Sequence, residues 1–333
     1  MEEGGSPPMR RLLIGFLCAA FFAISAMTIQ TLGRVFSFDA PVPAASREPM
    51  DKPRIVLISR ERDTPFWREL ERGAFEAAGR HGVQLQAWGS FGLYEADFLR
   101  NLELAIASRV DGIIAQGLDN DDFKKLTAIR AAENGIPVIT VGSDVPVAES
   151  MRRTYVGSDH RAAGRLVAER LAEDLGGAGR VVVLTSERPE HFERERLAGI
   201  LSVTERFDGI VVETASSGSA NDELARVVRD RLNAHPDTKA FVSVAYHNAG
   251  VIAREIGRRF RAADFCLYAF DENPETVQLL RDGILRGIVA QDPYRMGEWS
   301  VSLMVRWLDG VDLPLDMDGY FTDIRLLTRE AMP

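Results

Sequence analysis

The sequence contains few residues of the kinds that build disulfide frameworks, zinc sites or nucleic-acid surfaces. Only two of its 333 residues are cysteines, Cys18 and Cys266, which excludes a disulfide-stapled scaffold and a CxxC zinc site. Lysine and arginine number 40 against 49 aspartates and glutamates, so the formal net charge is −9. Because phosphate binding depends on clustered lysine and arginine, an acidic chain without a basic block is a poor nucleic-acid binder.

Signatures of catalysis and of metal binding are absent from the sequence as well. No GxSxG, HExxH, Walker A or EF-hand pattern occurs, and the five histidines show no paired ligand spacing. The acidic run 119–122 lacks the alternating ligands and the glycine of a calcium loop. Ser158, Asp159 and His160 are consecutive residues in what reads as a hinge loop, so a triad is not expected there. We therefore expect no enzymatic activity, no metal and no cofactor.

The N-terminal region carries a long apolar run. Arg10 and Arg11 precede an uncharged stretch from Leu12 to Leu32, which is a charged n-region followed by an h-region long enough to span a bilayer. Residues 1–34 are thus a signal peptide or an uncleaved membrane anchor, and the apolar residues beyond Ser25 favour the anchor slightly. Either way, the positive-inside rule places the rest of the chain outside the cytoplasm, in the periplasm or at the cell surface of the envelope. Residues 35–53, rich in Pro, Ala and Ser, are expected to form a linker.

From residue 54 onward, short apolar runs alternate with amphipathic segments. Strands are expected at 54–59, 83–88, 112–115 and 137–141, and again at 180–185, 209–214, 240–244, 265–270 and 287–291. Continuous Val/Ile/Leu strands between amphipathic helices indicate parallel sheets covered on both faces. This many strands predicts an α/β protein with two similar Rossmann-like lobes joined by a hinge. Ligands of such folds bind beyond the carboxyl ends of the strands, and closure about the hinge is the expected motion.

Several motifs appear in an order that carries a resemblance. They are Thr64-Pro65-Phe66-Trp67, the strand entries 110–114 and 135–140, residues 155–159 with Ala163-Gly164, Glu195-Arg196 with Gly199, Ala269-Phe270-Asp271, and 290–294 with Gly297. Together they resemble the ribose- and galactose-type periplasmic sugar-binding proteins, the type I solute-binding fold of ABC transporter substrate-binding proteins. The resemblance covers about residues 54–325. It implies an N-terminal lobe of 54–156 plus 293–320 and a C-terminal lobe of 157–292 plus 321–333.

The resemblance also implies a ligand site. Its residues are Asp63, Thr64, Phe66, Trp67, Asp144, Arg196, Tyr246, Asp271 and Gln291, with a hinge at Gly157, Ser158, Asp159 and Asp292. Asp271 matches the family's acceptor carboxylate at a strand end, and Gln291 its crossover amide. For Thr64, the alternative role of capping the helix that begins at Pro65 is favoured. Phe66 is favoured as a core residue, whereas core and ligand roles are equally expected for Trp67.

Three positions depart from the family pattern. Gly142 and Ser143 stand where the family has Asp followed by Arg or Ser, with Asp144 one place later. Ala245 and Tyr246 replace an Asn-Asp pair, and Ser219 stands near the position of a second aromatic residue. Tyr246, His247 and Trp88 are candidate replacements. A site built to pair hydroxyl groups rejects ligands that leave its polar groups unpaired, so these changes alter specificity sharply.

The resemblance and the N-terminal run together lead to three functional expectations. The first is an extracytoplasmic solute receptor, acting as a monomer, that closes on a small polar ligand such as a mono- or oligosaccharide and delivers it to an ABC sugar importer. The second is an anchored sugar-sensing subunit for a sensor histidine kinase. The third is the effector core of a lactose-repressor-type transcriptional regulator, but such proteins need a helix-turn-helix head, and this chain has an apolar segment instead.

Overall fold

The computed structural model describes residues 21–25, 27, 52–89, 95–218, 220–245, 249–311 and 313–331. The chain divides into two units, Met1–Asp51 and Lys52–Pro333. Cys18, most of the apolar run and most of the predicted linker lie outside the described residues. Within the described residues, no helix combines the length and the apolar character that a membrane crossing requires.

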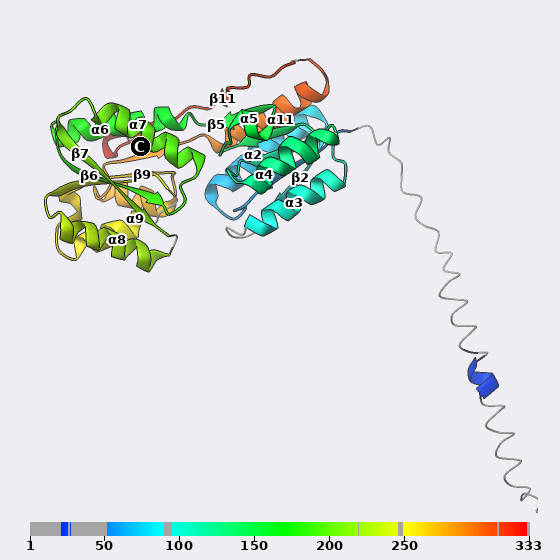
Figure 1. Ribbon diagram of the computed structural model, residues 1–333, viewed down its shortest axis with the longest axis horizontal. Helices are drawn as coiled ribbons and strands as arrows, with labels where there is room; N and C mark the ends of the chain where they lie inside the picture. The colour runs from blue at the N-terminus through cyan, green and yellow to red at the C-terminus, as the bar shows by residue number, and fades with distance from the viewer. Residues whose placement is uncertain are drawn as a thin grey trace, which may run out of the picture. The chain divides into compact units, whose positions relative to one another are not determined.

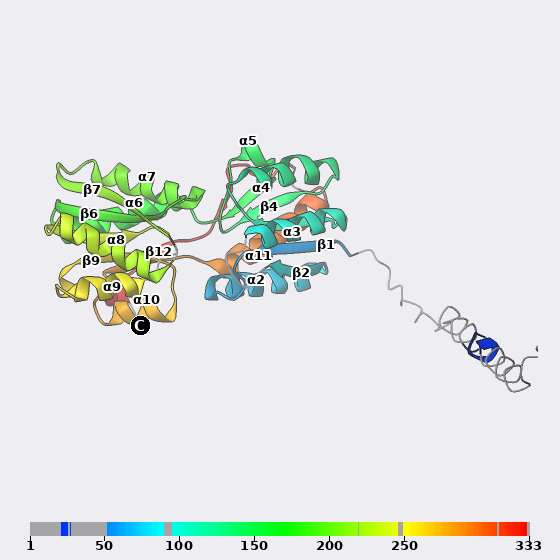
Figure 2. The ribbon, with the colours of Figure 1, turned by 60° about the horizontal axis from the view of Figure 1, so that its bottom comes forward.

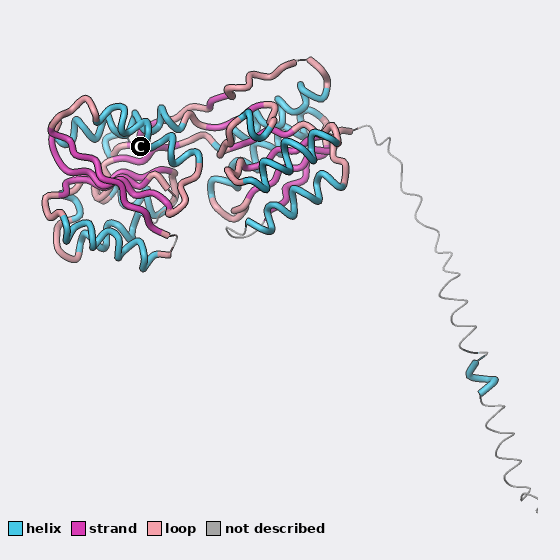
Figure 3. Tube along the Cα trace, in the orientation of Figure 1, coloured by secondary structure: helices cyan, strands magenta, loops and turns pink. Residues whose placement is uncertain are grey.

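The second unit contains two six-stranded sheets (Figures 1 and 3). The first sheet has the order β11-β5-β4-β3-β1-β2, and all of its strand pairs are parallel. Its strands are β1 (Arg54–Ser59), β2 (Gln84–Gly89), β3 (Gly112–Gln116), β4 (Val138–Val141), β5 (Thr154–Gly157) and β11 (Tyr320–Phe321). The second sheet has the order β12-β10-β9-β8-β6-β7, parallel except that β12 runs antiparallel to β10. Its strands are β6 (Ala178–Ser186), β7 (Gly209–Ser217), β8 (Thr238–Ser243), β9 (Cys266–Phe270), β10 (Gly287–Ala290) and β12 (Arg325–Leu327).

Helices cover both faces of each sheet, as Figure 2 shows. The first sheet is flanked by α2 (Pro65–His81), α3 (Glu95–Ala107), α4 (Asp121–Lys125), the π-helical turn η1 (Leu126–Ala131), α5 (Val147–Ser150) and α11 (Pro293–Leu308). The second is flanked by α6 (His160–Leu175), α7 (His191–Thr204), α8 (Asn221–Ala234), α9 (Ala249–Gly257) and α10 (Pro274–Arg281), with short 3₁₀ turns η2 (Ala262–Asp264) and η3 (Arg329–Ala331). The predicted α/β class with two Rossmann-like lobes is therefore confirmed.

The pleat of β1 shows why its sequence is apolar without interruption. Ile55 and Leu57 join the cluster beneath α2 and α11, whereas Val56 and Ile58 join the cluster beneath α3 and α4. Successive side chains of a strand point to opposite faces, and both faces are covered here. All four side chains are at most 2% exposed, so a polar residue at any of these positions would be buried.

A pair of glycines brings two helices together in each lobe. A Cβ atom on Gly297 of α11 would lie 1.9 Å from the Leu70 carbonyl oxygen of α2, and one on Gly73 would lie 2.0 Å from the carbonyl oxygen of Tyr294. In the other lobe, Gly164 of α6 and Gly199 of α7 approach the facing backbone in the same way. Three of these glycines belong to the motifs that carry the family resemblance, and their role in the structure is close helix packing.

The chain passes between the two sheets three times. It leaves the first sheet after Gly157, returns between Ala290 and Pro293, and leaves again between Phe321 and Arg325. The pairing of Phe321 with Gly157 places both residues in the first sheet. The predicted hinge residues Ser158, Asp159 and Asp292 thus lie on the connecting segments.

Candidate functional site

Three of the predicted ligand residues line one cavity of about 230 Å³. Phe66 reaches it from the first turn of α2, Asp271 from the end of β9, and Gln291 from the segment between β10 and α11. The cavity is therefore lined by residues from both lobes, at the carboxyl ends of β9 and β10, where ligands of open α/β sheets bind. Asp292 lines it as well.

Asp271 and Gln291 are linked to each other and to the hinge. The Gln291 side-chain amide donates a hydrogen bond to Asp271 Oδ1, and Ser158 Oγ donates to Gln291 Oε1 at 2.7 Å. Because a glutamine amide donates only through nitrogen and accepts only through oxygen, these two bonds fix which end faces the carboxylate. The backbone of Asp271 has a left-handed conformation, with φ at 69°, and its N–H donates to the Val289 carbonyl at 3.0 Å. The carboxylate is thus held on a constrained backbone.

The start of α2 gives Thr64, Phe66 and Trp67 different surroundings. Thr64 is the N-cap, since its hydroxyl accepts from the Trp67 N–H at 3.3 Å. Trp67 is 3% exposed and packs in the core cluster with Leu70. Phe66 is half-buried, packs against the same cluster and also lines the cavity, with the two rings nearly perpendicular at 5.5 Å. Helical phase explains the difference, because Trp67 lies on the face that Leu70 and Ala74 bury.

Asp63 and Asp144 lie in different surroundings from Asp271. Asp63 is exposed in the turn before α2. Asp144 accepts a hydrogen bond from the Thr140 hydroxyl and forms an ion pair with Arg152, both at 2.6 Å. It lines a separate cavity of about 330 Å³, together with Ser158 and Asp159. Asp144 is thus already engaged by its own lobe.

Arg196 occupies the interior of the second lobe. It is 1% exposed, and its Nη1 donates to the Val244 carbonyl at 2.9 Å. The guanidinium carbon lies 4.0 Å from the ring centre of Phe270 and 4.8 Å from that of Phe192. These contacts hold the end of β8 against the end of β9, next to the cavity wall formed by Asp271. Tyr246 lies outside the described residues.

Both hinge carboxylates begin a helix. Asp159 accepts from the Ala162 N–H at 2.8 Å and caps α6, and Asp292 accepts from the Arg295 N–H at 2.9 Å and caps α11. Gly157 ends β5, and its carbonyl accepts from the Thr322 N–H at 2.8 Å. Two of the three connecting segments therefore end directly in a capped helix.

Residues that the sequence did not single out connect the two lobes across a further cavity of about 380 Å³. Arg60, just after β1, forms an ion pair of 2.7 Å with Glu190, the N-cap of α7. Asp119, after β3, pairs with Arg194 of α7. No sequence motif marks these pairs, because each partner is an ordinary charged residue in a loop or at a helix start.

Burial shifts the pKa of three side chains, those of Glu190, Glu61 and His160. It raises the pKa of Glu190 above its ordinary value, against the opposing effect of Arg60, and it raises the pKa of Glu61 as well. Burial also lowers the pKa of His160 well below its usual range, and the charge of Arg196 acts in the same direction. His160 Nε2 lies 3.2 Å from the Tyr155 hydroxyl and 3.3 Å from the Gly142 carbonyl oxygen. The imidazole is thus a neutral link between α6 and the first lobe.

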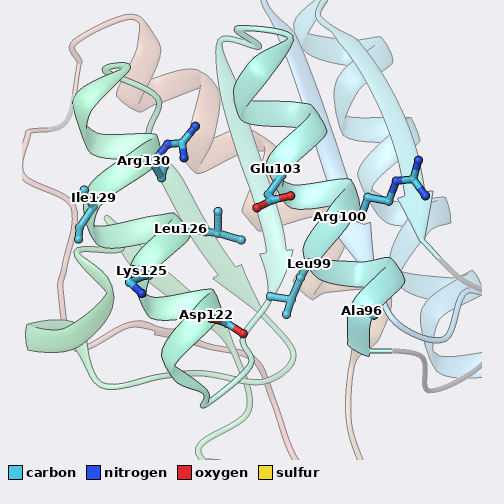
Figure 4. A pocket seen from close by; sticks show the side chains of 9 residues that line it. All are labelled: Ala96, Leu99, Arg100, Glu103, Asp122, Lys125, Leu126, Ile129 and Arg130. Carbon is cyan, nitrogen blue, oxygen red and sulfur yellow. The ribbon is translucent and has the colours of Figure 1, made fainter.

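A larger hollow lies away from these residues, between α3 and the α4–η1 segment. It measures about 780 Å³ and is lined by Ala96, Leu99, Arg100, Glu103, Asp122, Lys125, Leu126, Ile129 and Arg130 (Figure 4). None of the predicted ligand residues lines it. Its walls are the outer sides of helices and not strand ends, so we do not assign the ligand to it. Among the described residues, no group of three or more His, Cys, Asp or Glu side chains is placed to hold a metal ion.

Comparison with known proteins identifies the family. The model of the periplasmic binding protein domain matches residues 55–312. The chain belongs to this family. Its members are solute-binding proteins and not enzymes, and membership places the body of the chain outside the cytoplasm.

Individual relatives agree with this assignment. A glucose-galactose binding protein from Geobacillus stearothermophilus superposes with a TM-score of 0.79 at 31% identity, over 85% of this chain and 99% of that one. The D-ribose/D-allose-binding protein of Pseudomonas aeruginosa is 24% identical over 298 residues, covering 86% of this chain and 92% of the relative. The structure titled XylFII-LytSN complex superposes with a TM-score of 0.73 at 24% identity, over 84% of this chain and 99% of that one. The last two identities lie below one quarter, and the XylFII likeness shows the fold alone.

Proposed function

We propose that this periplasmic binding protein closes on a monosaccharide or a short oligosaccharide and delivers it to an ABC importer. The observation that carries the proposal is the cavity in which Phe66, Asp271 and Gln291 meet. An aromatic ring offers an apolar face to the C–H groups of a sugar, while a carboxylate and an amide pair with its hydroxyl groups. The glucose-galactose binding relative supports the sugar class.

Ligand binding is coupled to closure in this proposal. The cavity takes residues from both lobes, so a ligand contacts all of them only when the lobes are together. A ligand shifts a two-state equilibrium by as much as its affinities for the two states differ. The closed form is then the species that a membrane partner distinguishes from the empty protein.

A thermal-shift screen of the purified chain against pentoses, hexoses and disaccharides tests the ligand class. A compound that binds the native state alone raises the melting temperature by mass action. We expect a rise with at least one sugar, confirmed by calorimetry, and loss of that rise in Asp271→Ala. An amino-acid panel serves as the comparison. Stabilisation by amino acids and by no sugar contradicts the proposal.

A sensing role is the second candidate. It is favoured by the structural neighbour XylFII, which is recorded in complex with LytSN, and by the apolar N-terminal run, which would tether the protein as an uncleaved anchor. In this role the closed form signals through a sensor kinase and no sugar is transferred. Deleting the gene separates the two roles: uptake of the bound sugar is lost for an importer component, whereas sugar-dependent gene expression alone is lost for a sensor.

A further inference from the structure

The segment that returns from α11 to the second sheet has an unusual surface. We call residues 309–323 the return strap. It begins directly after α11 and includes β11 (Figure 1). It contains five aspartates and no Lys, Arg or His. Four of its large apolar side chains are exposed, namely Val311, Leu313, Met317 and Phe321, with exposed fractions of 68%, 56%, 54% and 48%. Single exposed apolar residues are common, but four within 11 residues indicate a contact surface.

The first lobe fixes the backbone of the strap. Arg152 Nη1 donates to the Met317 carbonyl at 2.9 Å, and the Thr154 hydroxyl donates to the Asp316 carbonyl at 2.6 Å. The Asp318 N–H donates to Asp316 Oδ1 at 2.9 Å, which closes a local turn. The exposed side chains are therefore displayed from an anchored backbone, and a partner need not order this segment in order to bind it.

The charged side chains of this segment are all acidic. Asp309, Asp316, Asp318 and Asp323 are all exposed. The two arginines that precede β5 are engaged elsewhere: Arg152 is buried and pairs with Asp144, and Arg153 stacks on the Trp307 ring at 4.7 Å. An anionic lipid surface repels such a strap. A protein face with an apolar depression and surrounding Lys or Arg residues complements it, because apolar anchors supply affinity while rim charges supply specificity and a fast encounter.

We propose that the return strap is the docking surface for a protein partner in the membrane, whose contact face is apolar and rimmed by Lys or Arg. The inference rests on the proposed function, which requires such a partner. It adds the location of the contact on this chain and the chemistry of the face that meets it. Met317 and Leu313 act as anchors, and Asp318 and Asp323 pair with the basic rim.

The test is site-specific photo-crosslinking of the full chain in the cells that naturally produce it. A photoreactive residue replaces Met317, and the matched control replaces Phe207, which is 36% exposed on the second lobe and lies between Glu205 and Asp208. We expect an adduct with a membrane protein from position 317 and none from position 207. The crosslinked peptide should contain Lys or Arg beside apolar residues. Asp318→Lys/Asp323→Lys should lower the adduct yield by about tenfold or more, whereas Glu205→Lys/Asp208→Lys should not.

Charge exchange makes the result decisive. When a basic residue of the crosslinked peptide is changed to Glu, the adduct of the Asp318→Lys/Asp323→Lys chain should return. An adduct with lipid, with a second copy of the chain or with a peptide lacking basic residues overturns the proposal, as does the absence of any adduct specific to position 317. The melting temperature of each purified variant shows whether that variant is folded. Sugar affinity tests the proposed function separately from the docking surface. If the unchanged chain binds no sugar, the proposed function fails whatever the crosslinks show.

Discussion

Ser158 and Gln291 lie on different connections between the lobes and are joined by a hydrogen bond of 2.7 Å between Oγ and Oε1. Since Gln291 also donates to Asp271, the hydroxyl group acts on the ligand cavity through the orientation of an amide. The bond also links two of the three connecting segments. A change at Ser158 is therefore expected to affect ligand affinity without any contact between Ser158 and the ligand.

Replacing Ser158 tests this positioning role. Ser158→Ala removes the donor and lets the Gln291 amide rotate, so sugar affinity should fall by about 1 kcal/mol, the usual net value of one hydrogen bond. Calorimetry with the sugar identified in the thermal screen measures the loss. Ser158→Thr keeps a hydroxyl group and should restore most of the affinity. Equal loss in both variants would indicate that packing, and not the hydrogen bond, is responsible.

The two cavity side chains should matter more. In the proposed function Asp271 and Gln291 pair with ligand hydroxyl groups. Asp271→Ala and Gln291→Ala would each remove one of these groups and leave its partner unpaired, so each should weaken binding by roughly 1–3 kcal/mol or more. The control is Asp144→Asn, because Asp144 is engaged by Arg152 outside this cavity. Its melting temperature should fall while sugar affinity in the folded protein changes little. Unchanged calorimetric affinity in both alanine variants contradicts the assigned site.

The ion pairs across the lobes should hold them together in the absence of ligand. Arg60 and Glu190 are largely buried, with 6% and 22% of their side chains exposed, so salt should screen this pair less than the more exposed pair of Asp119 and Arg194. Arg60→Ala should raise the radius of gyration of the ligand-free chain in small-angle scattering. Arg226→Ala, which breaks an exposed pair within α8, is the control. Indistinguishable scattering curves for Arg60→Ala and the unchanged chain would show that the pair does not stabilise closure.

His160 should make stability depend on pH in a defined direction. Its pKa in the folded protein lies below the ordinary value of 6.5, so the unfolded chain binds more protons and stability rises with pH. The contribution is complete above about pH 6.5 and is lost as the pH falls below that value. Urea unfolding at pH 7.5 and 5.5 should show a smaller loss on acidification for His160→Gln than for the unchanged chain. Comparing the two chains removes the carboxylate contributions common to both, and an equal loss would contradict the prediction.

Much of the fold was predictable because a strand that is buried on both faces of its sheet has a continuously apolar sequence. The residues of β1 are apolar without interruption, since each packs into one of two helix layers, and the predicted range 54–59 matches the observed strand. Shorter elements carried no comparable signal. β11 has two residues and α5 has four, and both depend on their neighbours in the fold rather than on their own sequence.

The helical segment that follows β3 changes its hydrogen-bond pattern part-way along. It begins as α4, capped by Asn120, and continues from Leu126 as a π-helical turn. The apolar spacing that predicts a helix does not distinguish the two hydrogen-bond patterns, because both are set by backbone geometry. Element type was therefore predictable at this position, and its exact form was not.

The candidate site was predictable where a motif supplied the residue and not where distant loops meet. Asp271 and Gln291 were named from motifs and line one cavity. Phe66 and Trp67 are adjacent apolar residues, and the sequence does not tell which of them is fully buried against Leu70 and which also reaches the cavity. The Arg60–Glu190 pair joins residues 130 positions apart, and only the arrangement of the lobes brings them together.

The discontinuous path of the chain has a consequence for its biogenesis. The first sheet completes its edge with β11, and α2 gains its packing partner α11, only after five strands of the second sheet, β6 to β10, have been synthesised. While the chain emerges through the membrane from its N-terminus, the face of α2 around Leu70 and Gly73 stays uncovered until residues 293–308 arrive. A truncation that removes α11 and β11 should thus damage the lobe that is made first. A chaperone on the outer side of the membrane would meet this incomplete lobe with the apolar face of α2 exposed.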